Sequence, residues 1–223
     1  MEPAEQVRIV VGDAVLDGDL VVPPNARGVV LFAHGSGSSR HSPRNRYVAE
    51  ELRRGDIGTL LMDLLTPQEE DVDNRTAELR FDLPLLAQRL QIATEWLHRR
   101  EDLSKFDLGY FGASTGAAAA LIAAVKLPKL VRAIVSRGGR PDLAGEALAQ
   151  VQAPTLLIVG GNDGPVVGMN RDAFDRLTTE KQLEIIPGAT HLFEEPGALE
   201  QVAQLALSWF ARYLGTARDS RVA

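Results

Sequence analysis

The chain has 223 residues, of which 45% are hydrophobic, and a formal net charge of −6. This length suits one α/β domain, residues 1–223, and the absence of cysteine excludes disulfides, a thiolate nucleophile and a cysteine-ligated metal. The acidic balance without a basic run argues against nucleic acid as a partner. The longest apolar stretch, residues 117–125, is too short to cross a membrane, and the acidic N-terminus lacks the layout of a signal peptide. We therefore expect a soluble, cytoplasmic protein, and its oligomeric state stays open.

The order of predicted elements indicates an α/β protein. Two β-rich runs, residues 6–11 and 14–22, flank Gly12-Asp13, which predicts a β-hairpin. Short apolar runs then alternate with stretches of helical periodicity. We expect strands at 28–33, 57–62, 106–111, 131–135, 155–159 and 183–186, and helices at 47–54, 82–97, 114–125, 143–150, 170–177 and 198–214. The alternation predicts a mostly parallel twisted sheet with helices on both faces and the N-terminal antiparallel hairpin at one edge.

One connection, residues 63–82, is expected to be long and polar. It begins at a strand end and carries the acidic run Glu69-Glu70-Asp71. Long connections in compact domains are often functional or disordered. The segment therefore either walls a cleft or is simply solvated, and the sequence leaves both interpretations open.

Ligands of such sheets bind beyond the carboxyl ends of the strands, so the residues that follow each strand are the candidates for chemistry. Residues 112–116, Gly-Ala-Ser-Thr-Gly, follow one strand and precede a helix. This G-x-S-x-G sequence in strand–turn–helix context is a nucleophile elbow, which predicts Ser114 as the nucleophile. The alternative is a helix-capping serine between two packing glycines.

A serine nucleophile needs an adjacent base, most often histidine. The chain has four histidines: His34, His41, His98 and His191. Only His191 follows Ser114, and elbow hydrolases order their triad as Ser, acid, His along the chain, which predicts His191 as the general base. His41, in a Ser/Arg-rich loop, is the one alternative base that merits a test. Asp163 follows the strand at 155–159 and is the predicted acid that orients His191, although Asn-Asp-Gly is also a turn signal.

Further residues at strand ends indicate how a substrate is held. A glycine-rich turn, residues 34–39, follows the strand at 28–33, and we assign the oxyanion hole to the backbone N–H groups of Ser36 and Thr115. A phosphate-binding loop would end in Lys-Ser or Lys-Thr, which this turn lacks. Gly35, Arg137 and Arg140 are candidate substrate-binding residues, the arginines because their planar guanidinium groups suit a carboxylate or phosphate. A structural or solvated arginine is the alternative.

With these residues in view, the chain resembles the α/β-hydrolase superfamily along nearly its whole length, and most of all the dienelactone-hydrolase-like branch. The resemblance rests on the elbow at Ser114, on Asp163, on Gly188-Ala189-Thr190-His191 and on the His34-Gly35 turn. It implies a compact hydrolase fold without a large cap domain, and about twenty residues between the strands at 131–135 and 155–159 leave no room for one. True dienelactone hydrolases use a cysteine nucleophile, which this chain lacks, so cyclic dienelactones do not follow as substrates.

The leading functional hypothesis is hydrolysis of a small carboxylic ester or thioester through an acyl-enzyme, which needs no metal or organic cofactor. Two alternatives keep the same fold. One is a non-catalytic binding or regulatory module, which the full set of triad residue types argues against. The other is an acyltransferase that passes the acyl group to an acceptor other than water, and product analysis with competing acceptors distinguishes it from a hydrolase.

Overall fold

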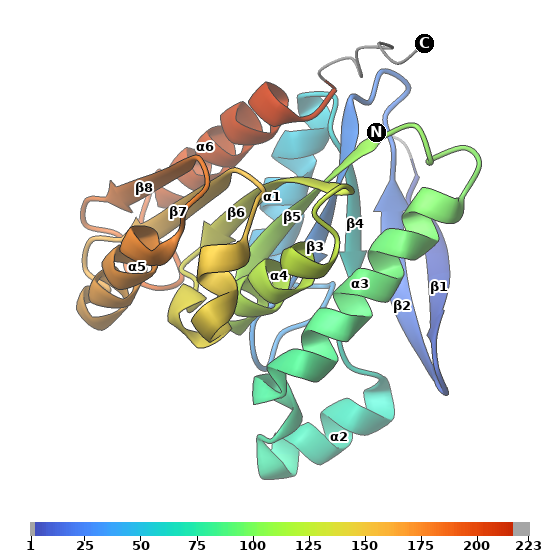
Figure 1. Cartoon of the computed structure of the whole chain (residues 1–223), viewed down its shortest axis with the longest axis horizontal. Coiled ribbons are helices and arrows are strands. Elements are labelled where there is room, and N and C mark those ends of the chain that lie inside the picture. Colours follow the sequence, from blue (N-terminus) through green and yellow to red (C-terminus); the bar gives the residue numbers. More distant parts are fainter. Residues whose placement is uncertain (1–2, 216–223) are drawn as a thin grey trace.

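The computed structural model describes residues 3–215 and contains one eight-stranded sheet (Figure 1). The strands are β1 (Glu5–Val11), β2 (Ala14–Val21), β3 (Gly28–Ala33), β4 (Gly58–Met62), β5 (Asp107–Ala113), β6 (Val131–Arg137), β7 (Thr155–Gly160) and β8 (Lys181–Ile186). Their order across the sheet is β1-β2-β4-β3-β5-β6-β7-β8. All pairs from β4 to β8 are parallel, whereas β1 pairs antiparallel with β2, and β2 with β4. The predicted sheet and its edge hairpin are confirmed.

Helices cover both faces of the sheet. They are α1 (Pro43–Arg54), α2 (Pro67–Thr76), α3 (Leu83–Arg99), α4 (Thr115–Lys126), α5 (Gly164–Arg176) and α6 (Ala198–Tyr213), with 3₁₀ segments η1 (Leu79–Phe81) and η2 (Pro141–Gln150). Figure 1 places α1 and α6 on one face and α3, α4 and α5 on the other. The described connection between β6 and β7 holds η2 and no cap domain. Within residues 3–215, no helix is both long and apolar enough to traverse a lipid bilayer.

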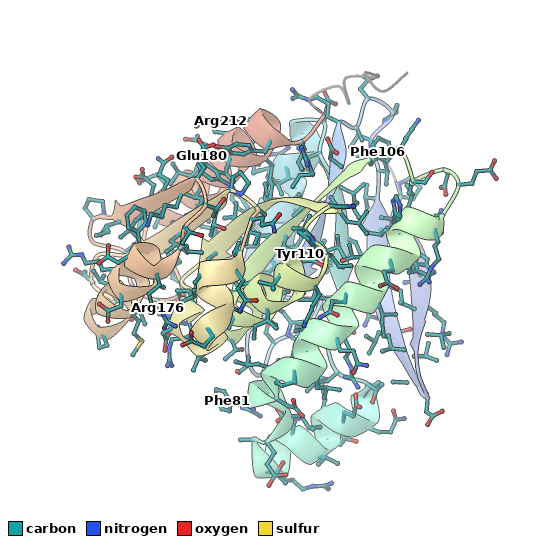
Figure 2. The ribbon with its side chains drawn as sticks, in the orientation of Figure 1. Phe81, Phe106, Tyr110, Arg176, Glu180 and Arg212 are labelled. Atoms are coloured by element: carbon teal, nitrogen blue, oxygen red, sulfur yellow. The ribbon has the colours of Figure 1, made fainter. Side chains whose placement is uncertain are left out.

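The core lies in two layers because the strands are buried on both faces. In β6, Ala133 and Val135 pack in the layer under α1 and α6, whereas Ile134 packs in the layer under α3 and α4. Tyr110 of β5 points toward α3, and its hydroxyl lies 2.6 Å from that of Thr94 (Figure 2). This hydrogen bond satisfies a buried phenol, so the aromatic ring fills the core without leaving a polar atom unpaired.

The connection at residues 63–82, for which the sequence left two interpretations open, contains α2 and η1. A capping box begins α2: the Glu69 amide donates to Thr66 Oγ1 at 3.2 Å, and the Thr66 amide donates to Glu69 Oε2 at 2.7 Å. Arg89 of α3, only 3% exposed, pairs with the same Glu69 carboxylate. The helix is fixed by a cap and by ion pairs, so apolar periodicity could not reveal it.

Two helices begin earlier than their apolar pattern indicates. Helix α1 begins at Pro43 rather than at residue 47, with Ser42 as its cap, and α5 begins at Gly164, directly after Asp163. Both first turns carry a proline, a good helix starter that contributes nothing to an apolar stripe. The rest of the first turn of α1 is polar, whereas in α5 Gly164 and Gly168 flank Val166 and Val167 and interrupt the apolar pattern. The expected helix at 143–150 is instead η2, whose turns are interrupted at Gly145.

Candidate active site

Ser114 lies in a strained turn between β5 and α4. Its backbone has φ 49° and ψ −123°, a conformation that non-glycine residues rarely adopt. A Cβ on Gly112 would lie 2.4 Å from the Ala117 Cα, and one on Gly116 would lie 2.3 Å from the Ala33 carbonyl oxygen. The two elbow positions therefore tolerate no side chain. The turn exposes Ser114 at the N-terminus of α4, where the helix dipole favours negative charge.

His191 and Asp163 meet beyond the carboxyl ends of β8 and β7. His191 Nδ1 lies 2.7 Å from Asp163 Oδ2, and the carboxylate is 14% exposed whereas the imidazole is 40% exposed. The two loops are tied together by Asn162, whose amide donates to the Ala189 carbonyl and whose side chain donates to the Gly188 carbonyl, both at 2.9 Å. A carboxylate at this distance fixes the Nδ1–H tautomer and leaves Nε2 as the basic nitrogen.

The turn after β6 joins Ser114 to the loop after β8 that carries His191, which we call the histidine loop. The Ser114 amide donates to the Arg137 carbonyl at 3.3 Å, and the Arg140 amide donates to the Ser114 carbonyl at 3.0 Å. On the other side of the same turn, a Cβ on Gly138 would lie 3.6 Å from His191 Cε1. Ser114 and His191 thus both border residues 137–140, so the structure brings all three predicted triad residues to one edge of the sheet.

The predicted oxyanion-hole residues also lie together. Ser36 Oγ and Thr115 Oγ1 are 3.0 Å apart, which joins the turn after β3 to the first turn of α4. At Gly35, a Cβ would lie 2.9 Å from the Ser114 Cβ, so this glycine lets the turn approach the serine. The first N–H groups of a helix have no intrahelical acceptor, which leaves the Thr115 N–H free to meet a ligand.

His34 is buried and has structural partners. Its Nε2 accepts a hydrogen bond from the Leu64 amide at 3.0 Å, and its Nδ1 lies 2.9 Å from the Gly35 carbonyl oxygen. The ring is therefore neutral with its proton on Nδ1, and burial lowers the pKa of His34 below its ordinary value. His41, the alternative base, is exposed in its loop. Within residues 3–215, no group of three or more His, Asp or Glu side chains is arranged to hold a metal ion.

The two candidate substrate-binding arginines have different surroundings. Arg140 forms a two-pronged pair with Asp142 at 2.8 and 2.9 Å. Arg137 belongs to the end of β6 and points toward α1, where it is 6% exposed and donates to Asn45 Oδ1 at 3.3 Å. Burial, together with repulsion from Arg44, lowers the pKa of Arg137 to about 10. Its Nε has no hydrogen-bond partner among the described residues, so one buried donor remains for an acceptor.

Three residues that the sequence analysis missed hold the histidine loop. Phe193, 1% exposed with φ 57°, lies under the Arg137 guanidinium, 5.8 Å from ring centroid to Cζ. Arg44 of α1 pairs with Glu194 at 3.2 Å. A buried aromatic in an unfavourable backbone conformation two residues after His191 indicates a loop fixed by tertiary packing. The one sequence signal was the apolar pair Leu192-Phe193 between His191 and the acidic residues Glu194 and Glu195.

The fold and the site define an α/β hydrolase: an elbow serine after β5, with an Asp–His pair beyond the following strands of a mostly parallel sheet. A family model for the dienelactone hydrolase family matches residues 44–214. The chain belongs to this family, and family membership supports hydrolase activity.

Solved structures agree with this placement. The crystal structure of a dienelactone hydrolase from Anabaena variabilis is 60% identical, with a TM-score of 0.93 over 96% of this chain and 100% of that one. A Xanthomonas campestris protein described as an α/β serine hydrolase without a lid has a TM-score of 0.75 over 96% of this chain and 97% of its own, at 19% identity. The second likeness shows the fold alone.

A curated relative has a different name. A Mycobacterium tuberculosis protein, provisionally named a phosphoribosyl transferase, is 56% identical over 210 residues, which cover 94% of this chain but 46% of that protein. The chain therefore spans about half the length of this relative, and the name describes a longer molecule.

Proposed function

We propose that the protein hydrolyses a small carboxylic ester or thioester through an acyl-enzyme intermediate on Ser114. The observation that carries the proposal is the 2.7 Å contact between His191 Nδ1 and Asp163 Oδ2, at the same sheet edge as a serine held at φ 49°. A neutral serine is a weak nucleophile, and an adjacent base of this kind activates it. Structural or capping roles require no such combination of serine, histidine and aspartate.

In the first half of the reaction, Ser114 Oγ attacks the carbonyl carbon while His191 Nε2 takes the hydroxyl proton. Asp163 stabilises the imidazolium that results. The backbone N–H groups of Ser36 and Thr115 hold the oxyanion of the tetrahedral intermediate. When the carbonyl re-forms, the bond to the leaving oxygen or sulfur breaks, and His191 returns the proton to the leaving group.

In the second half, water replaces the departed alcohol or thiol. His191 removes a proton from this water as it attacks the acyl-enzyme, and a second tetrahedral intermediate is held by the same two donors. Its collapse releases the carboxylic acid and returns the proton to Ser114 Oγ. An acyltransferase follows the same steps with another acceptor in place of water, so product analysis with alcohols or amines added to the reaction separates the two functions.

Arg137 is the stronger of the two candidates for binding an anionic group of the substrate. Arg140 already has Asp142 as its partner, whereas Arg137 keeps an unpaired Nε near the histidine loop. A buried guanidinium without a carboxylate is costly unless an anion joins it. We include Arg137 in the proposal as the residue that favours esters bearing a carboxylate or phosphate.

The proposal is tested by treating the protein with a fluorophosphonate and measuring its intact mass. We expect one adduct on the wild-type protein, because the probe reacts with an activated serine whatever the natural substrate is. Ser114→Ala should form no adduct, whereas Ser208→Ala, which removes an exposed serine of α6, should react like the wild type. A folded wild-type protein that takes up no probe would instead favour the non-catalytic binding module.

A further inference from the structure

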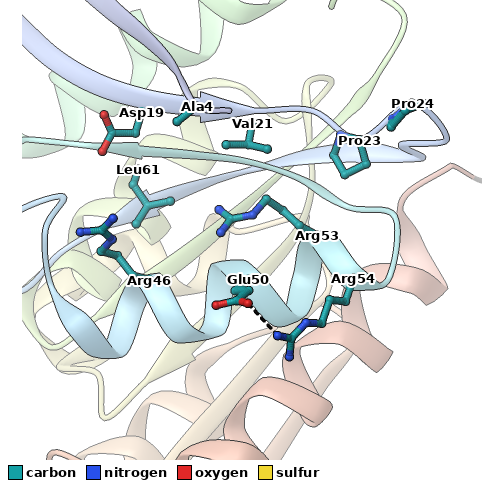
Figure 3. A pocket seen from close by; sticks show the side chains of 10 residues that line it. All are labelled: Ala4, Asp19, Val21, Pro23, Pro24, Arg46, Glu50, Arg53, Arg54 and Leu61. Atoms are coloured by element: carbon teal, nitrogen blue, oxygen red, sulfur yellow. Dashed lines mark hydrogen bonds and ion pairs between the residues drawn. The ribbon is translucent and has the colours of Figure 1, made fainter. Parts of the chain in front are cut away.

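A cavity lies on the α1 face of the sheet, apart from the candidate active site, and none of the proposed catalytic residues lines it. It has a volume of about 280 Å³ and is bounded by β2, β4 and α1 (Figure 3). One wall is apolar and is formed by Ala4, Val21, Pro23, Pro24 and Leu61. The other wall is charged and is formed by Arg46, Glu50, Arg53 and Arg54, with Asp19 on the strand side. The cavity therefore combines a hydrophobic surface with guanidinium groups.

Both carboxylates of this cavity face other arginines. Glu50 Oε1 accepts a hydrogen bond from Arg54 Nη2 at 2.6 Å, and the dashed line in Figure 3 marks this pair. Asp19 Oδ1 lies 3.8 Å from the Nε of Arg40, which also pairs with Asp63. Each carboxylate is therefore already engaged by an arginine other than Arg46 and Arg53, the two remaining arginines of the lining.

Those remaining arginines, Arg46 and Arg53, form no ion pair within 4.0 Å among residues 3–215. In the part of the chain that the structure describes, the Arg53 guanidinium donates a hydrogen bond only to the Thr59 hydroxyl, at 3.1 Å. Burial lowers the pKa of the half-buried Arg53 guanidinium, Glu50 raises it, and Arg46 lowers it again. The protein thus keeps two mutually repelling cations at one cavity although its net charge is −6. An anion between them would relieve both the repulsion and the desolvation cost.

The spacing of the two arginines suits a ligand that lies along α1. They are seven residues apart, which places them on one face of the helix about 10 Å apart along its axis. In Figure 3 the Arg53 side chain reaches back along α1 toward Arg46, beneath Val21, and Leu61 is drawn between the two guanidinium groups. A head group held by the guanidinium groups would leave the rest of the ligand against the proline and aliphatic wall.

We propose that this cavity is a binding site for a small organic anion, whose carboxylate or phosphate is held by Arg46 and Arg53 and whose apolar body packs on Val21, Pro23 and Leu61. A volume near the lower end for small-molecule sites fits a ligand of a few carbon atoms. Binding here is independent of Ser114, so the site exists whether or not the proposed hydrolysis occurs.

The test uses hexyl phosphate and hexanoate as probes, with amide chemical shifts of the ¹⁵N-labelled full chain as the readout. We expect saturable shifts at Val21, Arg53 and Leu61 with at least one probe, in wild type and in Ser114→Ala alike. Hexanol and inorganic phosphate should bind more weakly, because each supplies only half of the interaction. The tighter of the two probes identifies the head group.

Variants then locate the interaction. The double variant Arg46→Gln/Arg53→Gln should weaken binding at least about tenfold, the expected effect of losing charge-assisted hydrogen bonds. Arg99→Gln, which removes an exposed arginine of α3, should leave binding unchanged. If the double variant is poorly folded, Arg46→Glu reverses the charge at an exposed position and should also weaken binding. The proposal is overturned if neither probe binds, if the shifts lie only around Ser114 and His191, if inorganic phosphate binds as tightly as hexyl phosphate, or if the folded variants bind like the wild type.

Discussion

At the scale of single residues, substitution of Arg137 distinguishes a role in substrate binding from a role in supporting the histidine loop. If it binds an anionic group, Arg137→Gln should raise KM about 10- to 100-fold for an ester that carries a carboxylate, such as a 4-nitrophenyl hemisuccinate, and leave the neutral acetate nearly unchanged. Arg140→Gln at the same turn is the matched control and should alter neither substrate much. An equal fall in kcat for both esters would show that Arg137 only supports Phe193 and the histidine loop.

The same residue shows what the sequence could not provide. Gly112 to Gly116 and the order of Ser114, Asp163 and His191 are local or linear signals, and they were enough to predict which residues meet at the sheet edge. The residues that a side chain contacts in the fold cannot be read from its neighbours in the sequence. Arg137 was expected in a turn after a strand, but β6 extends to include it, and the alternation with Ala133 and Val135 directs it under α1. Its neighbours Asn45 and Phe193 are far away in sequence.

At the scale of elements, the capping box of α2 predicts a measurable stability effect. Thr66→Ala removes the acceptor of the Glu69 amide, so it should lower the free energy of unfolding by about 1 kcal/mol, measured by urea denaturation. Thr76→Ala at the other end of the helix removes an exposed hydroxyl that donates to the Val72 carbonyl and accepts a long hydrogen bond, 3.4 Å, from the Glu78 amide, and it should cost less. Amides of α2 should also exchange faster in Thr66→Ala. Equal effects of the two substitutions would mean that the cap does not hold the helix.

Helix α2 also explains which elements were predictable. Every buried strand could be predicted from a short apolar run in the sequence, because a parallel sheet needs apolar side chains on both faces. Helix α2 packs through Glu69 to Arg89 and through Asp73 to Arg80, so its sequence resembles a solvated acidic loop. Only the spacing of Thr66, Pro67 and Glu69 carried the signal. To predict an element held by caps and ion pairs, its capping residues must therefore be given as much weight as the periodicity of its apolar residues.

At the scale of the whole molecule, the fold gathers the candidate site from segments far apart in the chain. Ser114, Asp163 and His191 follow β5, β7 and β8, and the Ser36 turn follows β3, so every contribution lies at the carboxyl edge of the parallel strands. This edge is common to all parallel strands, which is why strand order needed no prediction for the site to be found. No such rule locates the cavity lined by Arg46 and Arg53, because that cavity depends on how α1 lies against the β1–β2 hairpin.

The stability of the whole molecule should depend on pH through His34, which joins the turn after β3 to the turn after β4. Burial lowers its pKa in the folded protein below the ordinary value of 6.5, so below that pH the unfolded chain takes up a proton that the folded chain does not. The free energy of unfolding should therefore fall as pH falls, by up to about 1.4 kcal/mol per pH unit from this group, and its contribution should be constant above about pH 7. His34→Gln keeps a polar side chain near the Leu64 amide but does not titrate, so urea denaturation between about pH 7 and pH 5 should give a flatter profile than the wild type. His41→Gln, at an exposed position, should follow the wild-type profile, and a wild-type profile as flat as that of His34→Gln would contradict the role assigned to the buried ring.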